Sequence, residues 1–361
     1  IKIKNVSETG LGLAIPFYSV DVKRPVDVIE EILRVYGYNN IDFTTKLNAS
    51  IAPTTKFEDY KLQNLAGDLL VGQGFYEILA NSLTTLTYNK HSENLKDEAS
   101  VKMLNPLSAD LSVLRQSMLF SGLEAISYNI NRKRANLKFF EFGKTYHQFS
   151  ENREEFKHLS LLITGKREES NWVNNPGASD FFYLKSMAIN LLKRLGIKDI
   201  KSQPLKSDLF QEGLVLKSQK NALVTFGVVK TSICKSFDIK QEILYADFDW
   251  DKVIKLASNN SIIFKEIPKY PIVKRDFALL LDEKVLFKEL HDIAFETERK
   301  FLKEVSLFDV YKGKNLPAGK KSYAVSFTLG DDNNTLKDKQ IDKIMSKLRN
   351  NYESKLGAEL R

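Results

Sequence analysis

The sequence has 361 residues, 43% of them hydrophobic, and a formal net charge of +8. This length predicts two or three domains, and the hydrophobic fraction excludes an intrinsically disordered chain. The mild positive charge allows a polyanionic partner without requiring one, because a solvated basic surface gives the same excess. Cys234 is the only cysteine, which excludes an intramolecular disulfide and favours a reducing compartment. No apolar run approaches the roughly 20 residues of a membrane span, so we expect no membrane partner.

The first predicted block covers residues 1–45 and contains one helix, at 26–36. Pro25 stands just before this helix, where helices often begin, and Gly37 is a natural C-terminal cap. Four carboxylates lie before and within the start of the helix. They are Asp21, Asp27, Glu30 and Glu31.

Two interpretations of these carboxylates stay open. Asp27 and Glu30 have the spacing of a capping box, and acidic residues in a first helical turn are favoured by the helix dipole. Alternatively, the four carboxylates gather a hard cation such as Mg²⁺, which prefers oxygen ligands. Asp21 lies before the helix and contributes nothing to its cap, so capping explains this residue least well.

The second predicted block covers residues 46–268. Amphipathic segments predict helices at 57–71 and 111–131. Short apolar runs predict strands between and after these helices. The predicted strands cover residues 75–83, 137–142, 159–164, 214–216, 222–229 and 243–249. Strands mixed with separated helices indicate an α+β domain built around an antiparallel sheet.

The third predicted block covers residues 269–361. It contains a strand at 277–281, a helix at 286–300, a strand at 305–311, and a third strand at 322–329 that follows Lys320-Lys321. Thr335 is the predicted N-cap of a second helix that ends at Gly357, and residues 358–361 add an edge strand. In the third strand the apolar residues alternate with small ones, which is typical of a half-buried strand. The order β-α-β-β-α-β indicates a ferredoxin-like fold.

One face of this ferredoxin-like sheet is a candidate site for an unpaired base. Asp309 and Tyr311 are two residues apart and therefore share a face, and Ser322 begins the small-residue face of the next strand. An aromatic ring can stack on a base, and a carboxylate can accept from the N–H donors of guanine. Lysines that could meet phosphates flank this face. They are Lys312, Lys314, Lys320 and Lys321. The alternative is that Tyr311 only covers core edges and that the lysines are solvated.

Motifs of catalysis are absent from the sequence. There is no phosphate-binding loop of the Walker type and no Gly-x-Gly-x-x-Gly fingerprint. None of the four histidines has metal-ligand spacing or pairs with a nucleophile in the sequence. The basic run at 131–138 could touch phosphates, but such a run is more often a solvated loop after a helix C-terminus.

Three ordered stretches carry a family resemblance. The first consists of Asp21, Asp27, Glu30-Glu31 and Arg34-Val35-Tyr36-Gly37-Tyr38. The second consists of Asn105-Pro106-Leu107-Ser108, Leu114-Arg115-Gln116-Ser117, Gly122-Leu123 and Phe140-Glu141-Phe142-Gly143. The third consists of Tyr270-Pro271, Arg275-Asp276, Leu307-Phe308-Asp309-Val310-Tyr311, Lys320-Lys321-Ser322, Thr335-Leu336 and Leu360-Arg361. Together they resemble the C-terminal portion of the beta subunit of bacterial phenylalanyl-tRNA synthetase. Asp42 replaces a proline that is frequent in the family.

The resemblance implies three modules. Residues 1–45 are similar to the end of a winged-helix module, 46–268 to a class II synthetase-like core that is not itself active, and 269–361 to a ferredoxin-fold anticodon-binding domain. It implies that Asp21, Asp27, Glu30 and Glu31 bind Mg²⁺ at the contact with the alpha subunit. For the third module it makes Asp309, Tyr311 and Ser322 candidates for contacts with anticodon bases of tRNA(Phe), with Lys312, Lys320 and Lys321 beside them.

The expected function follows from these modules. We expect a cytoplasmic ligase complex of two alpha and two beta chains, in which the alpha subunit performs ATP-dependent aminoacylation and this chain alone is inactive. Because the sequence begins at Ile1 rather than Met, we expect a fragment or a processed product. Two alternatives stay open: a free-standing RNA-binding protein with a ferredoxin-like module, and a structural α+β protein without an RNA ligand.

Overall fold

The structure, a computed structural model, describes residues 1–43, 45–46, 49–50, 59–258, 264, 266–313 and 316–361. It divides the chain into two compact units, Ile1–Asn260 and Ser261–Arg361. The sequence places this boundary at residue 268, which lies inside the second unit. The predicted boundary after residue 45 stays a prediction.

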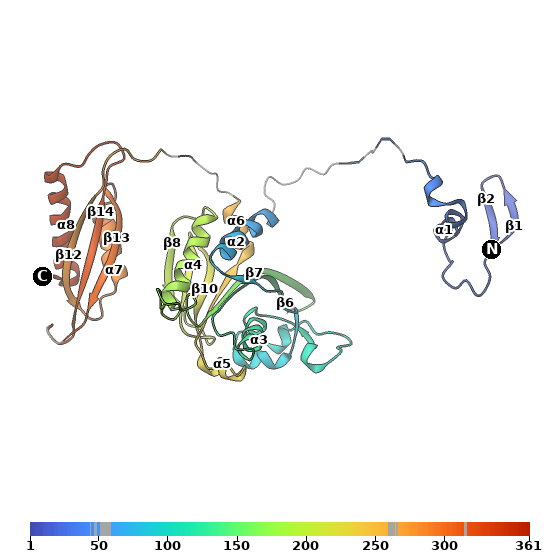
Figure 1. The fold of residues 1–361 in the computed structure, drawn as a ribbon, viewed down its shortest axis with the longest axis horizontal. Helices are drawn as coiled ribbons and strands as arrows, with labels where there is room; N and C mark the ends of the chain where they lie inside the picture. Colours follow the sequence, from blue (N-terminus) through green and yellow to red (C-terminus); the bar gives the residue numbers. More distant parts are fainter. Residues whose placement is uncertain (44, 47–48, 51–58, 259–263, 265, 314–315) are drawn as a thin grey trace. The chain divides into compact units, whose positions relative to one another are not determined.

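The N-terminal part of the first unit contains a hairpin and a helix (Figure 1). The hairpin pairs β1 (Lys2–Ser7) with β2 (Gly10–Ala14) in antiparallel fashion, and the helix is α1 (Pro25–Tyr36). A short 3-10 helix, η1 (Tyr38–Asn40), follows. Pro25 lies in the first turn of α1 and Gly37 follows its last residue with a φ of 92°, so the predicted helix is confirmed. The winged-helix assignment of this segment stays a prediction.

The central part of the first unit is built around a seven-stranded sheet. Its strands are β3 (Tyr76–Glu77), β6 (Leu137–Phe149), β7 (Asn152–Thr164), β8 (Ile200–Pro204), β9 (Phe210–Ser218), β10 (Asn221–Val229) and β11 (Ile243–Asp249). Their order in the sheet is β3-β6-β7-β11-β10-β9-β8, and all neighbours are antiparallel except β3 and β6. The predicted antiparallel α+β architecture is confirmed. β8 has no counterpart among the predicted strands.

Helices cover both faces of this sheet (Figure 1). They are α2 (Asp59–Gly72), α3 (Leu119–Ile130), α4 (Phe181–Arg194), α5 (Thr231–Ser236) and α6 (Trp250–Ala257). α2, α4 and α6 bury one face around Phe140 and Phe226, whereas α3 and α5 bury the other around Phe139 and Leu162. Residues 57–58 of the helix predicted at 57–71 lie outside the described residues.

The predicted helix at 111–131 is wrong over its first part. The structure has a 3-10 helix, η4 (Ala109–Leu111), a strand, β5 (Val113–Leu114), and only then α3. β5 pairs with β4 (Leu83–Thr84), and two further 3-10 helices, η2 (Leu86–His91) and η3 (Asp97–Ala99), lie between them in the chain. The backbone at Val113 and Leu114 bonds across to a distant strand, a contact that helical periodicity does not reveal.

The second unit has the predicted ferredoxin-like order. Its elements are β12 (Val273–Asp282), α7 (Phe287–Thr297), β13 (Leu302–Tyr311), β14 (Lys320–Leu329), α8 (Asp338–Leu356) and β15 (Glu359–Leu360). The strands form an antiparallel sheet in the order β13-β14-β12-β15. Both helices pack on the face that carries Tyr323, Val325 and Phe327.

The N-cap predicted at Thr335 is wrong. α8 begins at Asp338 and its N-cap residue is Lys337, whose N–H donates to the side-chain oxygen of Gln340. Leu336 is buried in the core just before the cap, which fixes where the chain enters the helix. Gly357 ends α8 with a φ of 59°, as predicted. In the parts of the chain that are described, no helix has the length and apolarity needed to cross a bilayer.

Candidate functional site

The four-stranded sheet of the second unit has an open face built mostly from small side chains. Strand register places Tyr311 opposite Ser322 and Asp309 opposite Ala324, so these residues share one face. A bulge between Leu307 and Asp309 shifts the pairing of β13 by one residue, so that Asp309 and Tyr311 lie on the open face instead of the helix-covered face of Leu307. The expected side-by-side placement of Asp309, Tyr311 and Ser322 is therefore present.

Neighbouring residues on β12 extend this face. Leu280 lies opposite Ser322 and Ala278 lies opposite Ala324. Tyr311 is 39% exposed, whereas Ser322 is only 8% exposed. The middle of the face therefore carries small side chains, and the Tyr311 ring and the exposed Asp309 carboxylate lie at its edge on β13. This arrangement suits a flat ligand. Sequence reasoning missed Ala278 and Leu280, although the period of two along β12 places both on this face.

The lysines beside the open face differ from one another. The Lys312 ammonium lies 2.7 Å from the Glu283 carboxylate, an exposed pair that raises the pKa of Lys312 and lowers that of Glu283. Lys320 is half-buried and lies opposite Asp282 on the open face. Lys314 lies outside the described residues.

The predicted phosphate contact of Lys321 is contradicted by its burial. This lysine is 4% exposed, its Nζ donates to the Glu283 carbonyl oxygen at 2.8 Å, and it lies 4.5 Å from the centre of the Tyr323 ring. The physical reason is the parity of β14, which turns Lys321 toward the helix-covered face with Tyr323. The same alternation was visible in the sequence.

The four N-terminal carboxylates do not form a metal site in this structure. Asp27 Oδ2 accepts the backbone N–H groups of Lys23 and Arg24, and its Oδ1 pairs with the Arg24 guanidinium at 3.0 Å. Arg24 and these backbone donors lower the pKa of Asp27 to about 2. Both carboxylate oxygens of Glu31 accept from Arg34. Among the described residues no group of three or more His, Cys, Asp or Glu side chains could hold a metal ion.

Of the four carboxylates, Asp27 caps α1 as its third helical residue, with Arg24 as the N-cap, so the predicted capping pair of Asp27 and Glu30 is wrong. Each oxygen of Asp27 already has a donor, and acidic residues of this kind stabilise the start of a helix. Asp21 and Glu30 are exposed. The Mg²⁺ assignment stays a prediction.

A buried ion pair joins two of the motifs in the central domain. Arg115 Nη1 lies 2.9 Å from Glu141 Oε1, and the two side chains are 4% and 1% exposed. The same guanidinium donates to the Lys144 carbonyl and to Ser121. Gly143 makes room for it, since a Cβ there would come within 2.3 Å of Arg115. The pair fixes β5 against β6 and is structural.

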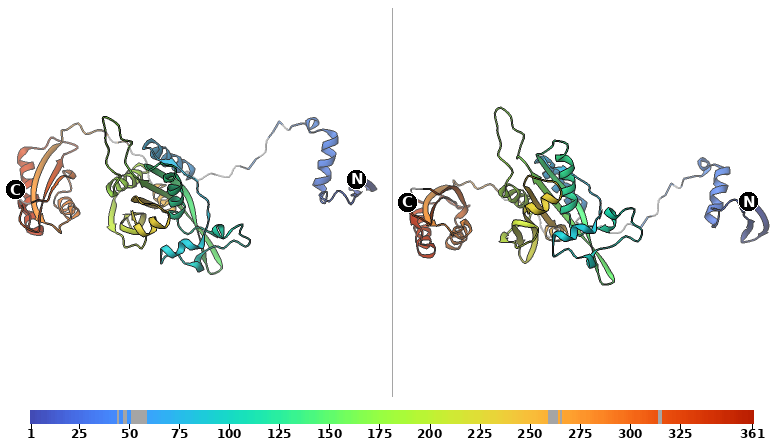
Figure 2. Two further views of the ribbon diagram at one scale, coloured as in Figure 1. Left: turned by 60° about the horizontal axis from the view of Figure 1, so that its bottom comes forward. Right: turned by 90° about the horizontal axis from the view of Figure 1, so that it is seen from below.

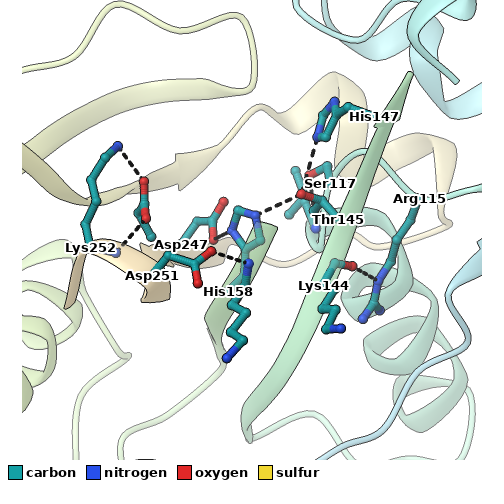
Figure 3. Close-up of polar contacts among 12 residues, drawn as sticks. Arg115, Ser117, Lys144, Thr145, His147, His158, Asp247, Asp251 and Lys252 are labelled. Atoms are coloured by element: carbon teal, nitrogen blue, oxygen red, sulfur yellow. Dashed lines mark hydrogen bonds and ion pairs between the residues drawn. The ribbon is translucent and has the colours of Figure 1, made fainter. Parts of the chain in front are cut away.

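A chain of polar contacts crosses the face of the central sheet that carries Glu141 (Figure 3). Asp247 Oδ1 lies 2.8 Å from His158 Nδ1, and His158 Nε2 lies 2.9 Å from the hydroxyl of Thr145. His147 reaches the same hydroxyl at 3.3 Å. Sequence reasoning missed this cluster because the residues are separated by up to 102 positions, from Thr145 to Asp247.

The geometry resembles a nucleophile activated by a histidine, but access is lacking. Thr145 is 2% exposed and its hydroxyl already lies between two imidazoles, so no substrate carbonyl can approach it. Burial disfavours the charged form of His158, yet Asp247, Asp249 and Asp251 outweigh that effect and raise its pKa. Burial and the neighbouring His158 lower the pKa of His147.

The comparisons with known proteins agree across the chain. Residues 41–250 match the model of the phenylalanyl tRNA synthetase beta chain CLM domain, 268–361 match the ferredoxin-fold anticodon binding domain, and 1–38 match the tRNA synthetase B5 domain. The anticodon-binding match covers the four-stranded sheet with its helices. The B5 match covers the hairpin and α1.

Curated relatives carry the corresponding name, "Phenylalanine--tRNA ligase beta subunit". The chain is 49% identical over 377 aligned positions to the protein from Bacteroides fragilis, 41% identical to that from Porphyromonas gingivalis and 33% identical to that from Clostridium acetobutylicum. The alignments cover 96% to 100% of this chain but only 43% to 46% of those proteins. With the central match spanning more than half of its residues, the chain belongs to the phenylalanyl-tRNA synthetase beta chain family.

Proposed function

We propose that this chain is a non-catalytic part of a phenylalanine–tRNA ligase and that it binds the anticodon region of tRNA(Phe). The observation that carries the proposal is the open face of the C-terminal sheet, where Tyr311 and Asp309 stand beside a floor of small residues. An unpaired base can stack on the ring and donate to the carboxylate. The match of residues 268–361 to the ferredoxin-fold anticodon binding domain supports the same assignment.

In this proposal the chemistry belongs to a partner. The alpha subunit activates phenylalanine with ATP, and this chain contributes a scaffold within a cytoplasmic complex of two alpha and two beta chains. The buried hydroxyl of Thr145 supports the non-catalytic role, since the Asp247–His158–Thr145 arrangement offers no reachable nucleophile. Phenylalanine-dependent pyrophosphate exchange by this chain alone would contradict it.

The test of anticodon binding is a comparison of two RNAs. The complete complex of alpha subunit and beta subunit is titrated with tRNA(Phe) and with a tRNA(Phe) altered at its first anticodon base. We expect weaker binding of the altered tRNA, and we expect Asp309→Asn to reduce the difference. Equal binding of both tRNAs by the unmodified complex removes Asp309 and Tyr311 from the site.

The predicted Mg²⁺ site has its own test. Asp27→Ala is a poor probe, because Asp27 also caps α1 through the N–H groups of Lys23 and Arg24. Asp21→Asn leaves that cap intact. A complex with the alpha subunit that is weakened by Asp21→Asn and by a chelator favours the metal, and a complex indifferent to both rejects it. A beta chain that never co-purifies with an alpha chain favours the free-standing RNA-binding alternative.

A further inference from the structure

Gly313 lies two residues after Tyr311, directly beneath the end of its ring. A Cβ on Gly313 would lie 2.5 Å from the Tyr311 hydroxyl oxygen, 2.6 Å from Cζ and 3.2 Å from Cε1. The φ angle of Gly313 is outside the left-handed region, so its backbone conformation is open to any residue. A side chain at position 313 would therefore meet the side chain of Tyr311 first.

Tyr311 is the last residue of β13 and is followed by a residue that forms an exposed ion pair. Tyr311 pairs with Ser322 across the strands, and Lys312 is bound to the Glu283 carboxylate at 2.7 Å. Glu283 is itself fixed, since its N–H donates to the Gly319 carbonyl and its own carbonyl accepts from Lys321. The three nearest atoms to a Cβ at Gly313 all belong to the ring end of Tyr311, so this ring is the part that yields to a methyl group there.

We infer that Gly313 is a positioning residue for Tyr311. Its missing side chain lets the ring of Tyr311 extend past the end of β13 toward Gly313, in an orientation that accepts an unpaired nucleobase. This role rests on the proposed function of the open face. In this role Gly313 determines where the Tyr311 ring lies before RNA binds. A ring already in place loses little conformational freedom on binding, which favours affinity.

The test is a double-mutant cycle in the complete complex, using Gly313→Ala, Tyr311→Ala and the double variant. We expect Gly313→Ala to weaken tRNA(Phe) binding by about tenfold, the size of one lost base stack, without lowering the melting temperature. In the Tyr311→Ala background the same change should cost nothing further. Gly177→Ala is the matched control, because Gly177 has open space around it and no left-handed φ.

Each outcome decides a different point. Full affinity in Tyr311→Ala overturns the proposed face and this role with it. Reduced affinity in Tyr311→Ala, with full affinity in Gly313→Ala, overturns the positioning role alone. Additive losses in the double variant also overturn it, since Gly313 would then act independently of the ring. If Gly313→Ala lowers the melting temperature, the double variant should restore it, and failure to do so rejects the steric argument.

Discussion

Helices cover both faces of the seven-stranded sheet, whereas α7 and α8 cover one face of the four-stranded sheet and leave Asp309 and Tyr311 exposed. Burying a polar group on the covered sheet costs free energy unless the group finds a partner inside the protein. Arg115 and Glu141 do so as an ion pair, and His158 lies between Asp247 and Thr145. The comparison teaches that similar residue types serve stability on one sheet and remain available to a ligand on the other.

Part of the seven-stranded sheet protrudes beyond its neighbouring strands and carries exposed polar residues. β7 pairs with β11 only from His158 onward, so residues 144–157 of β6 and β7 extend past β11 as a two-stranded arm (Figure 2). Lys144 and Glu155 form an exposed ion pair on this arm. This pair provides a control for the buried pair in the same unit.

The largest expected effect is on the buried pair. Glu141→Ala leaves the Arg115 guanidinium buried without its counter-charge, and we expect a loss of about 3–5 kcal/mol in the free energy of unfolding. Urea denaturation measures it. Glu155→Ala removes the exposed partner of Lys144 and should cost less than about 1 kcal/mol. Equal losses in the two variants would show that burial does not separate these pairs.

The next effect concerns discrimination on the open sheet. Asp309→Asn should leave the melting temperature unchanged, because the carboxylate is exposed, and should reduce discrimination between tRNA(Phe) and the anticodon-altered tRNA by about tenfold. Equilibrium binding to the complete complex measures this ratio. A lower melting temperature with unchanged discrimination would assign Asp309 to the fold instead.

A smaller effect depends on pH. Asp247→Asn should lower the free energy of unfolding by about 1–2 kcal/mol near pH 6, because it replaces the carboxylate that faces a charged imidazole with a neutral amide. The carboxylates raise the pKa of His158 above its unfolded value, so this stabilisation is complete below the unfolded pKa and is lost as pH rises through the folded pKa. The loss caused by the substitution should therefore shrink at alkaline pH.

The measurement is urea unfolding on both sides of the titration, in a His147→Gln background. His147 needs to be removed because its pKa is lowered and its contribution runs in the opposite direction with pH. A loss that is the same at both pH values would mean that His158 is not charged in the folded state.

The smallest effect is expected at Glu283. Glu283→Gln releases Lys312 from its ion pair and should strengthen tRNA binding by roughly twofold at low salt, with a salt dependence steeper by about one ion. Binding titrations over a series of salt concentrations measure the slope. Lys312→Gln in the same background should remove the gain, and a gain that persists would assign it to another group.

The fold of the C-terminal unit was largely predictable because its signals are local. Period-two alternation along β14 identified the strand and its core face, and Gly357 marked the end of α8. Lys321 lies two residues before Tyr323 and therefore shares its buried face, so the alternation along β14 excludes this lysine from the open face. Thr335 was misassigned because a favourable capping residue is common outside caps as well.

The central domain was less predictable because its decisive contacts join distant segments. Val113 and Leu114 fit a helical pattern, yet they pair with β4, which lies about 30 residues earlier in the chain. Spacing within one strand predicted that Asp309 and Tyr311 share a face, whereas the bulge after Leu307 decided that this face is the open one. The cluster of Thr145, His158 and Asp247 did not, since only strand register brings those residues together.

The sequence by itself determined the element order of the C-terminal unit, the helix α1 and the family resemblance, because each rests on residues a few positions apart. Tertiary structure alone decided that Arg115 meets Glu141, that Asp27 is occupied with the cap of α1, and that Gly313 lies under the ring of Tyr311. The reason is physical: hydrophobic periodicity fixes which face of an element is buried, whereas register, packing and hydrogen-bond competition fix which polar groups meet. The proposed function of the open sheet depends on strand register and packing, which bring its side chains together.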